Sequence, residues 1–314
     1  MSTFYYFRPG YGGHSSTNAY LLSLLSYYIY DKKDVAGNPS IPGRGSHSSK
    51  FRRLFQDLSN ENPFNVRTQF SGATEWAVLS NSKLVIVVFR GMDDDLIPEW
   101  KSNITYHLRT APKSWGRNVR VHSGFYSTLS GVYQTIRQEV RNRNDNGRIP
   151  VYLTGHSRGA ALATLCAYRF QKVGGVPVAG VYVFGAPRVG TVQGWRDQYK
   201  IAGLWDMTFR WVNYRDPAHK VPDYGDARPW RQNVTNRYAH AGQLNLFSKS
   251  GSATYNHSNP DYEPGATIVP TDGDYHAMNL YCRRLFNRLS GRRRRSQNNP
   301  GYLTKNDVKV PLPV

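Results

Sequence analysis

The feature that most constrains this chain is the pentapeptide Gly-His-Ser-Arg-Gly at residues 155–159. The apolar run of residues 151–154 precedes it, and small helix-forming residues follow it from 160 to 168. This order predicts a strand, a tight turn and a helix, with Ser157 at the turn. Glycines flank the serine because the backbone there is strained and close neighbours leave no room for a side chain. The turn therefore presents the Ser157 hydroxyl beside a helix N-terminus, which favours negative charge.

A Gly-x-Ser-x-Gly pattern alone also occurs as an ordinary turn rich in glycine and serine. Here the strand before it and the helix after it favour a nucleophile elbow, the turn that presents a catalytic serine. A serine hydroxyl is a poor nucleophile, so it needs a nearby base and a carboxylate that orients the base. The rest of the sequence must therefore supply a histidine and an acid.

Predicted strands and helices alternate along the chain. Helices are predicted over residues 18–30, 124–143 and 275–289, and strands over residues 74–79, 84–90, 151–154, 178–184, 209–214 and 243–247. Such alternation is typical of an α/β fold with a mostly parallel central sheet flanked by helices. We find no internal repeat and no clear linker before residue 290, which indicates one domain.

The composition is that of a folded chain, with 39% hydrophobic residues among 314. No apolar stretch is long enough for a membrane-spanning helix, and the N-terminal residues lack the layout of a secretory signal. We therefore expect a cytoplasmic or membrane-peripheral protein, with secretion by a non-classical route left open. Cys166 and Cys282 fall in predicted helices and are expected to be buried apolar residues. No metal-binding spacing occurs, so we propose no metal site.

The formal net charge of +20 is unusually high. Four arginines at residues 292–295 contribute part of it, and the rest is spread along the chain. Such charge favours anionic surfaces such as phospholipid headgroups, although a solvated surface with a loose tail is the simpler interpretation. The arginines are not interleaved with aromatic residues as in a nucleic-acid-binding groove. Peripheral binding to an anionic membrane surface stays open, and nucleic-acid binding is not expected.

The catalytic acid is expected downstream of Ser157 and upstream of the histidine. Asp216 is the best candidate because it lies just past the predicted strand 209–214. Sites of open α/β sheets gather at the carboxyl ends of their strands. The competing aspartates lie in or beside a predicted helix or in a later loop: Asp197, Asp206, Asp223 and Asp226.

The catalytic base is expected beyond Asp216, where the candidates are His219, His240, His257 and His276. His219 is too close to Asp216 along the chain to be aimed easily at a separate elbow. His276 follows a loop and begins a predicted helix, a position that suits a base. Spacing therefore favours His276, and His240 stays the alternative.

Five stretches of the sequence together resemble the class 3 lipase family, which includes the fungal triacylglycerol lipases. They match its oxyanion loop, its Val-His-x-Gly-Phe motif, its serine elbow, its Phe-Gly-x-Pro-Arg-Val-Gly motif and its catalytic-aspartate segment, at residues 87–92, 121–125, 154–163, 184–190 and 213–222. Their order and spacing are far more specific than the elbow alone. The resemblance implies a single α/β-hydrolase domain, which we place over residues 1–290. The arginine-rich, polar composition of residues 291–314 predicts a basic, flexible tail.

The resemblance also assigns the histidine. Residues 238–242 are similar to a non-catalytic stretch of the family, which leaves His276 at the catalytic position. It therefore implies a triad of Ser157, Asp216 and His276, with no cofactor.

The oxyanion hole and the lid follow from the same resemblance. The backbone N–H groups of Met92 and Arg158 would stabilise the tetrahedral intermediate. The family's lid comes after the oxyanion loop, where Leu96, Ile97 and Trp100 would cover the site in water and face lipid when open. The alternative is a loop and helix that face the core. Consecutive aspartates make this segment polar, which favours an esterase of soluble or partly soluble esters.

We therefore expect a serine carboxylic-ester hydrolase, a lipase or esterase that cleaves acyl esters of lipid-like substrates through an acyl-enzyme. Its partner would be a lipid or a small ester. One alternative is a phospholipase A1 or galactolipase acting on anionic or polar lipids, which the positive charge would suit. The other is a lipase-like protein that binds without catalysis. The sequence predicts no oligomeric state.

Overall fold

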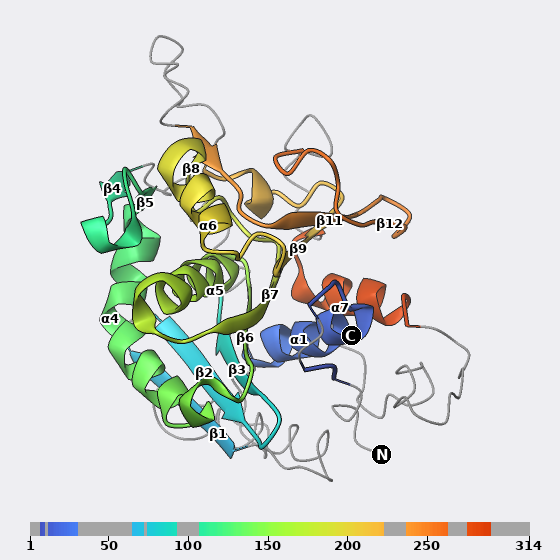
Figure 1. The fold of residues 1–314 in the computed structure, drawn as a ribbon. Coiled ribbons are helices and arrows are strands. Elements are labelled where there is room, and N and C mark those ends of the chain that lie inside the picture. The colour runs from blue at the N-terminus through green and yellow to red at the C-terminus, as the bar shows by residue number, and fades with distance from the viewer. Residues whose placement is uncertain are drawn as a thin grey trace.

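The computed structural model describes residues 7–9, 12–30, 65–71 (backbone only), 74–92, 107–222, 237–262 and 275–289. A sheet of eight strands forms its centre (Figure 1). In spatial order the strands are β1 (Asn65–Ser71), β2 (Thr74–Ser80), β3 (Val85–Phe89), β6 (Val151–His156), β7 (Val178–Phe184), β9 (Thr208–Asn213), β11 (Gln243–Phe247) and β12 (Ala253–Thr254). Pairing is parallel from β3 to β11 and antiparallel towards both edges.

The central strands are apolar because both of their faces are covered. In β3, Val85, Val87 and Phe89 belong to one hydrophobic cluster, and Ile86 and Val88 belong to another. Successive side chains of a strand point to opposite faces, so one continuous apolar run supplies both layers of the core.

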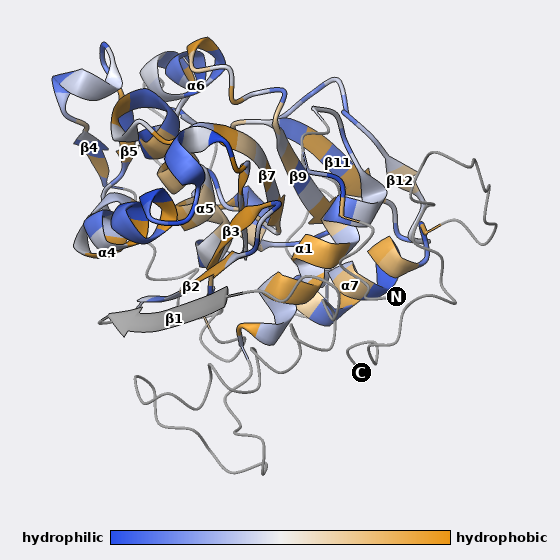
Figure 2. Ribbon diagram, turned by 60° about the horizontal axis from the view of Figure 1, so that its bottom comes forward, coloured by the Kyte–Doolittle hydropathy of each residue, from blue (hydrophilic) through white to orange (hydrophobic). Residues whose placement is uncertain are grey.

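Helices cover the two faces of the sheet. On one face α4 (Ser123–Arg141) packs against α5 (Arg158–Arg169), and on the other α1 (Ser16–Tyr28) packs against α7 (Met278–Phe286) (Figures 1 and 2). The apolar stripe of α4 is buried as its spacing predicts, at Val132, Ile136 and Val140. The predicted α/β architecture is therefore observed, with the carboxyl ends of the parallel strands free to carry a site.

The start of the last helix differs from the prediction. It begins at Met278, not at residue 275, because the backbone of Ala277 is extended, with φ −56° and ψ 128°. His276 consequently lies on the segment before α7 and outside its hydrogen-bonding pattern.

A second, small sheet was not predicted. It contains β4 (Leu108–Thr110), β5 (Arg120–His122), β8 (Gly190–Thr191) and β10 (Tyr238–Ala239), in the order β10-β8-β5-β4. Strands this short carry too few residues for a period-2 pattern to be recognised. The remaining elements of the described ranges are short. They are the α-helix α6 (Asp197–Ile201), the 3-10 helices η3 (Lys113–Trp115), η4 (Asp145–Gly147) and η7 (Ala218–Lys220), and the π-helical segments η5 (Phe170–Gly174) and η6 (Val192–Arg196).

Both cysteines are buried and free, Cys166 in α5 and Cys282 in α7, as the sequence predicts. No helix within the described ranges combines the length and the apolar character needed to cross a membrane.

Candidate active site

Ser157 occupies the turn between β6 and α5 with an unusual backbone conformation. Its φ of 55° and ψ of −127° are costly for any residue with a side chain. The flanking glycines permit this turn, since a methyl group at Gly155 would lie 2.5 Å from the Gly159 backbone and one at Gly159 would collide with the Phe89 carbonyl oxygen. The elbow predicted from the sequence is therefore present, with Ser157 directly before the first residue of α5.

Asp216 lies just beyond β9, and its buried carboxylate is surrounded by hydrogen-bond donors. The Ala218 N–H donates to Oδ1 at 2.8 Å, and the Tyr281 hydroxyl donates to Oδ2 at 2.5 Å. Burial alone would raise the pKa of Asp216, but His276 and the Tyr281 hydrogen bond outweigh it and lower that pKa to about 2. The carboxylate is therefore ionised at neutral pH.

His276 is oriented by that carboxylate. Its Nδ1 lies 2.9 Å from Oδ1 and 3.0 Å from Oδ2 of Asp216. Because an ionised carboxylate can only accept, Nδ1 must carry the proton. The other ring nitrogen, Nε2, then has a free lone pair and can act as a base.

Two neighbours bring His276 to the elbow. The Ser157 N–H donates to the Phe184 carbonyl oxygen at 3.0 Å. Gly185, which follows Phe184, lies against the Asp216 carboxylate and the His276 ring. A methyl group at Gly185 would lie 2.7 Å from Asp216 Oδ2 and 2.9 Å from His276 Nδ1. In addition, the rings of His156 and His276 have their centroids 4.3 Å apart. The elbow and the acid–base pair are therefore adjacent.

The two atoms that would react are left open. Within the described part of the chain, neither Ser157 Oγ nor His276 Nε2 has a hydrogen-bond partner, although both are buried. A hydrogen bond between nucleophile and base is often absent before substrate binds. Both atoms therefore keep their hydrogen-bonding capacity for a reacting group.

The loop after β3 approaches the elbow closely. A methyl group at Gly91 would lie 3.2 Å from Ser157 Cβ and 2.7 Å from the His156 carbonyl oxygen. Met92 follows directly and is partly exposed, and Arg158 begins α5. The two predicted oxyanion residues thus lie on segments next to the nucleophile. The lid candidates Leu96, Ile97 and Trp100 lie outside the described residues.

None of the alternative bases hydrogen-bonds to the Asp216 carboxylate within the described residues. His219 interacts with Asp216 only through its charge, and neither of its ring nitrogens has a hydrogen-bond partner there. His240 Nε2 contacts the His219 carbonyl oxygen at 2.9 Å, and Nδ1 of His257 lies in a local turn, 3.2 Å from the Asn259 carbonyl oxygen. The competing acids Asp197 and Asp206 are exposed, and Asp223 and Asp226 lie outside the described residues. Among the described groups, the structure brings together the acid and the base that the sequence favoured.

Tyr281 is a part of the site whose hydrogen bond the sequence did not predict. It bridges two groups, since its hydroxyl donates to Asp216 and accepts from the Asn213 N–H at 2.9 Å. Burial and then the charge of Asp216 raise the pKa of Tyr281 well above its usual value, so it stays protonated and can donate. Tyr281 lies five residues after His276, and this spacing does not predict a hydrogen bond to Asp216 unless the start of α7 is known.

The sequence profile of the family described as lipase (class 3) matches residues 86–224. This range contains Ser157, Asp216 and both predicted oxyanion residues. Over these residues the chain is similar to class 3 lipases. His276 lies beyond the matched residues, so its assignment rests on its contact with Asp216.

Two curated proteins are similar to part of this chain. Phospholipase A1 EG1, chloroplastic/mitochondrial, of Oryza sativa subsp. indica is 31% identical over 188 residues, and the match covers 50% of this chain and 41% of the relative. Secreted mono- and diacylglycerol lipase A of Penicillium cyclopium is 30% identical over 149 residues, which are 46% of this chain and 45% of the relative. The chain thus spans less than half the length of these two relatives.

A solved structure supports the fold. Lipase II from Rhizopus niveus superposes with a TM-score of 0.61 at 19% identity, covering 84% of this chain and 94% of that chain. The predicted α/β-hydrolase fold is confirmed.

Proposed function

We propose that this protein hydrolyses carboxylic esters of lipid-like substrates through a triad of Ser157, Asp216 and His276. The observation that carries the proposal is the Asp216–His276 pair, which holds His276 Nε2 free beside a serine elbow. The names of the relatives, a phospholipase A1 and a mono- and diacylglycerol lipase, favour an acyl lipid as substrate.

Each group has one task in this reaction. Ser157 Oγ attacks the ester carbonyl carbon while His276 Nε2 takes the hydroxyl proton. The same nitrogen then protonates the alcohol that leaves, and an acyl-enzyme remains on Ser157. Asp216 holds the imidazole in the required tautomer and stabilises its charged form. Water, activated by His276, releases the acid and restores the serine.

The negative charge of the tetrahedral intermediate needs donors that are already in place. We assign these to the backbone N–H groups of Met92 and Arg158, the second of which lies at the N-terminus of α5. Each such donor contributes on the order of 3 kcal/mol to transition-state stabilisation. A helix N-terminus supplies its share without reorganisation during the reaction.

The test is hydrolysis of p-nitrophenyl esters from acetate to palmitate by the wild type and by Ser157→Ala. We expect activity in the wild type and its loss in the variant, with the chain-length optimum separating an esterase from a lipase. Activity that survives in Ser157→Ala would overturn the assigned nucleophile. A wild type inactive at every chain length would favour a binding role without catalysis.

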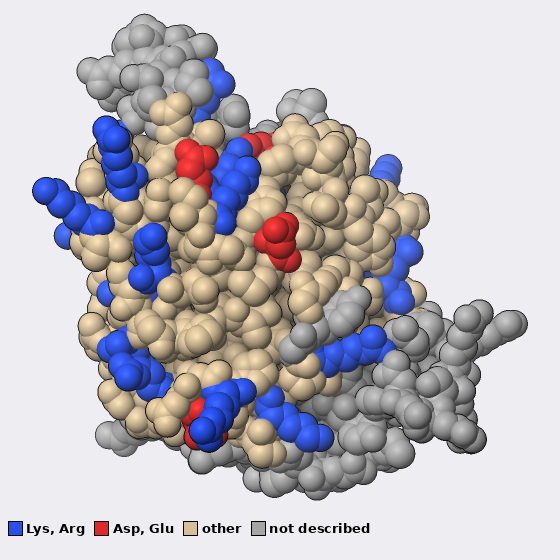
Figure 3. Space-filling view, viewed as in Figure 1, with Lys and Arg blue, Asp and Glu red and all other residues tan. Residues whose placement is uncertain are grey.

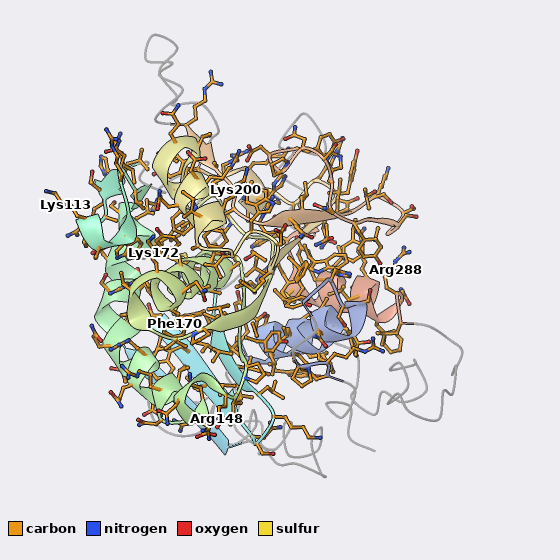
Figure 4. The ribbon with its side chains drawn as sticks, in the orientation of Figure 1. Lys113, Arg148, Phe170, Lys172, Lys200 and Arg288 are labelled. Atoms are coloured by element: carbon orange, nitrogen blue, oxygen red, sulfur yellow. The ribbon has the colours of Figure 1, made fainter. Side chains whose placement is uncertain are left out.

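The surface charge favours anionic lipid as a second substrate class. Figure 3 shows that lysine and arginine side chains outnumber acidic ones on the face that carries α5 and α6. Exposed basic side chains labelled in Figure 4 include Lys113, Lys172 and Lys200. Exposed acidic residues among the described ones are Asp145, Asp197 and Asp206. A surface of one sign attracts vesicles of the opposite sign and loses that attraction in salt.

We therefore propose that the domain also acts on anionic phospholipid at a vesicle surface. The measurement is acyl release from vesicles of phosphatidylglycerol and of phosphatidylcholine at rising salt, for the wild type and for the triple variant Lys113→Glu, Lys172→Glu, Lys200→Glu. On the phosphatidylglycerol vesicles alone, we expect acyl release to fall steeply as salt rises. On the same vesicles we expect it to be much lower in the triple variant than in the wild type. Equal salt-insensitive rates on both vesicles would contradict this substrate class.

A further inference from the structure

A polar side chain outside the triad holds the catalytic histidine from behind. His156, the residue before the nucleophile, is 1% exposed, and its Nε2 lies 2.7 Å from the backbone carbonyl oxygen of His276. Its ring also packs on the His276 ring, at 4.3 Å between centroids and 32° between planes. His276 is therefore fixed twice, through its Nδ1 by Asp216 and through its backbone by His156.

The hydrogen bonds of His156 define its tautomer. A carbonyl oxygen only accepts, so Nε2 of His156 must carry a proton. Burial, followed by the neighbouring His276, lowers the pKa of His156 to about 3, so the ring is neutral at neutral pH. Nδ1 of the neutral ring is then an acceptor, and the Tyr30 hydroxyl lies 2.9 Å from it and donates.

Tyr30 links this histidine to the oxyanion loop. It stands just beyond the end of α1, far in sequence from the other groups. Its hydroxyl lies against Gly91, where an added methyl group would collide with it. The side chain of Arg90, also on this loop, lies over the Tyr30 ring at 5.3 Å from its centroid. One tyrosine thus contacts both the loop before Met92 and the residue that anchors His276.

We propose that Tyr30 and His156 are positioning residues, which keep the His276 backbone and the oxyanion loop in fixed register with Ser157. This role rests on the proposed esterase function. It goes beyond the triad, because neither side chain takes a proton from substrate or supplies one. His276 lies before the first residue of α7, so its backbone contact with His156 is an anchor outside the helix.

Small displacements of a catalytic base are costly. A shift of about 1 Å in a reacting group can lower the rate by about 10²-fold. Loss of the His156 anchor should therefore lower kcat, while KM, which depends on contacts elsewhere, changes little. A residue that acts only on folding would instead lower the amount of active protein and leave kcat per active site unchanged.

The experiment compares steady-state kinetics on p-nitrophenyl butyrate for Tyr30→Phe, His156→Leu and His156→Gln, with active sites counted by a fluorophosphonate probe. We expect kcat to fall about tenfold in Tyr30→Phe and about 10²-fold in His156→Leu, with KM within about twofold. His156→Gln, whose amide can place a donor near the lost Nε2, should recover about tenfold over His156→Leu.

Tyr199→Phe is the matched control. Tyr199 is a buried tyrosine whose hydroxyl lies 2.8 Å from Thr208 Oγ1, away from the triad. Its variant should keep the wild-type kcat. Wild-type kcat per labelled site in both Tyr30→Phe and His156→Leu would overturn the positioning role while leaving the proposed function intact. A wild type that neither hydrolyses esters nor takes the probe would overturn the function, and the positioning role with it.

Discussion

The two nitrogens of His276 lie in opposite environments. Nδ1 faces a carboxylate that also accepts hydrogen bonds from Ala218 and Tyr281, so this side of the ring is fully engaged. Nε2 has no partner among the described residues, and neither has Ser157 Oγ. The orientation of the base is therefore built into the fold, whereas the contacts of the reacting atoms are left to the substrate.

The contact between Asp216 and Nδ1 of His276 is tested most severely by Asp216→Asn. An asparagine can offer its amide to Nδ1 and thereby favour the wrong tautomer of His276. We expect kcat on p-nitrophenyl butyrate to fall about 10⁴-fold with the fold intact by circular dichroism. Asp206→Asn is the control at an exposed aspartate. A loss below about tenfold in Asp216→Asn would mean that the tautomer is not set by this carboxylate.

The oxyanion loop, on the side of the reacting atoms, is tested by Gly91→Ala. The added methyl group would meet the Tyr30 hydroxyl and the His156 carbonyl oxygen, so the loop before Met92 must move. We expect kcat to fall by about 10²- to 10³-fold, the cost of losing one oxyanion donor. In Gly131→Ala on α4 a methyl group has nothing within 4 Å, and this control should keep full activity. Unchanged rates in both variants would place the oxyanion hole elsewhere.

A smaller effect is expected from Tyr281→Phe, which removes one of several donors to the Asp216 carboxylate. Because that hydrogen bond lowers the pKa of Asp216, its loss should raise the pKa and loosen the carboxylate. We expect kcat to fall about tenfold, equivalent to about 1.4 kcal/mol in the barrier. The comparison of kcat with that of Tyr199→Phe checks this. Equal rates in the two variants would leave Ala218 and His276 as the sufficient anchors.

The dependence of stability on pH tests whether two buried histidines of the site, His156 and His219, are neutral in the folded protein. Burial lowers the pKa of His156 and of His219 from 6.5 to about 3. Between these values the unfolded chain binds protons that the folded chain does not, so stability is highest above pH 6.5 and falls as pH decreases. Within this pH range, each histidine should lower the free energy of unfolding by about 1.4 kcal/mol for every unit by which the pH falls. Urea unfolding at pH 7, 6 and 5 measures this slope, which should shrink by about one proton in His219→Asn. An unchanged slope would show that His219 is not buried neutral.

Much of the site could be predicted from the sequence. The elbow is encoded locally, because strand, turn and helix occupy consecutive residues around Ser157. Asp216 could be found because it directly follows a recognisable strand. His276 needed more, since spacing left His240 as an alternative and only the family resemblance assigned His276, which the structure places against the carboxylate.

What could not be predicted depends on contacts between distant segments. Tyr30 meets His156 across 126 positions of the chain, and His156 meets His276 across 120. No local pattern encodes such pairs. The second sheet was missed for another reason, since its strands have only two or three residues each. The start of α7 was misplaced because the extended backbone of Ala277 has no marker in sequence.

The most direct test of the triad is covalent labelling with a fluorophosphonate, followed by intact mass and peptide mapping. It is applied to the wild type, to His276→Ala and, as a matched control, to His240→Ala. The account predicts a single adduct on Ser157, formed at the wild-type rate in His240→Ala and at least about 10³-fold more slowly in His276→Ala. An adduct on another residue, or equally fast labelling of Ser157 in His276→Ala, would contradict it.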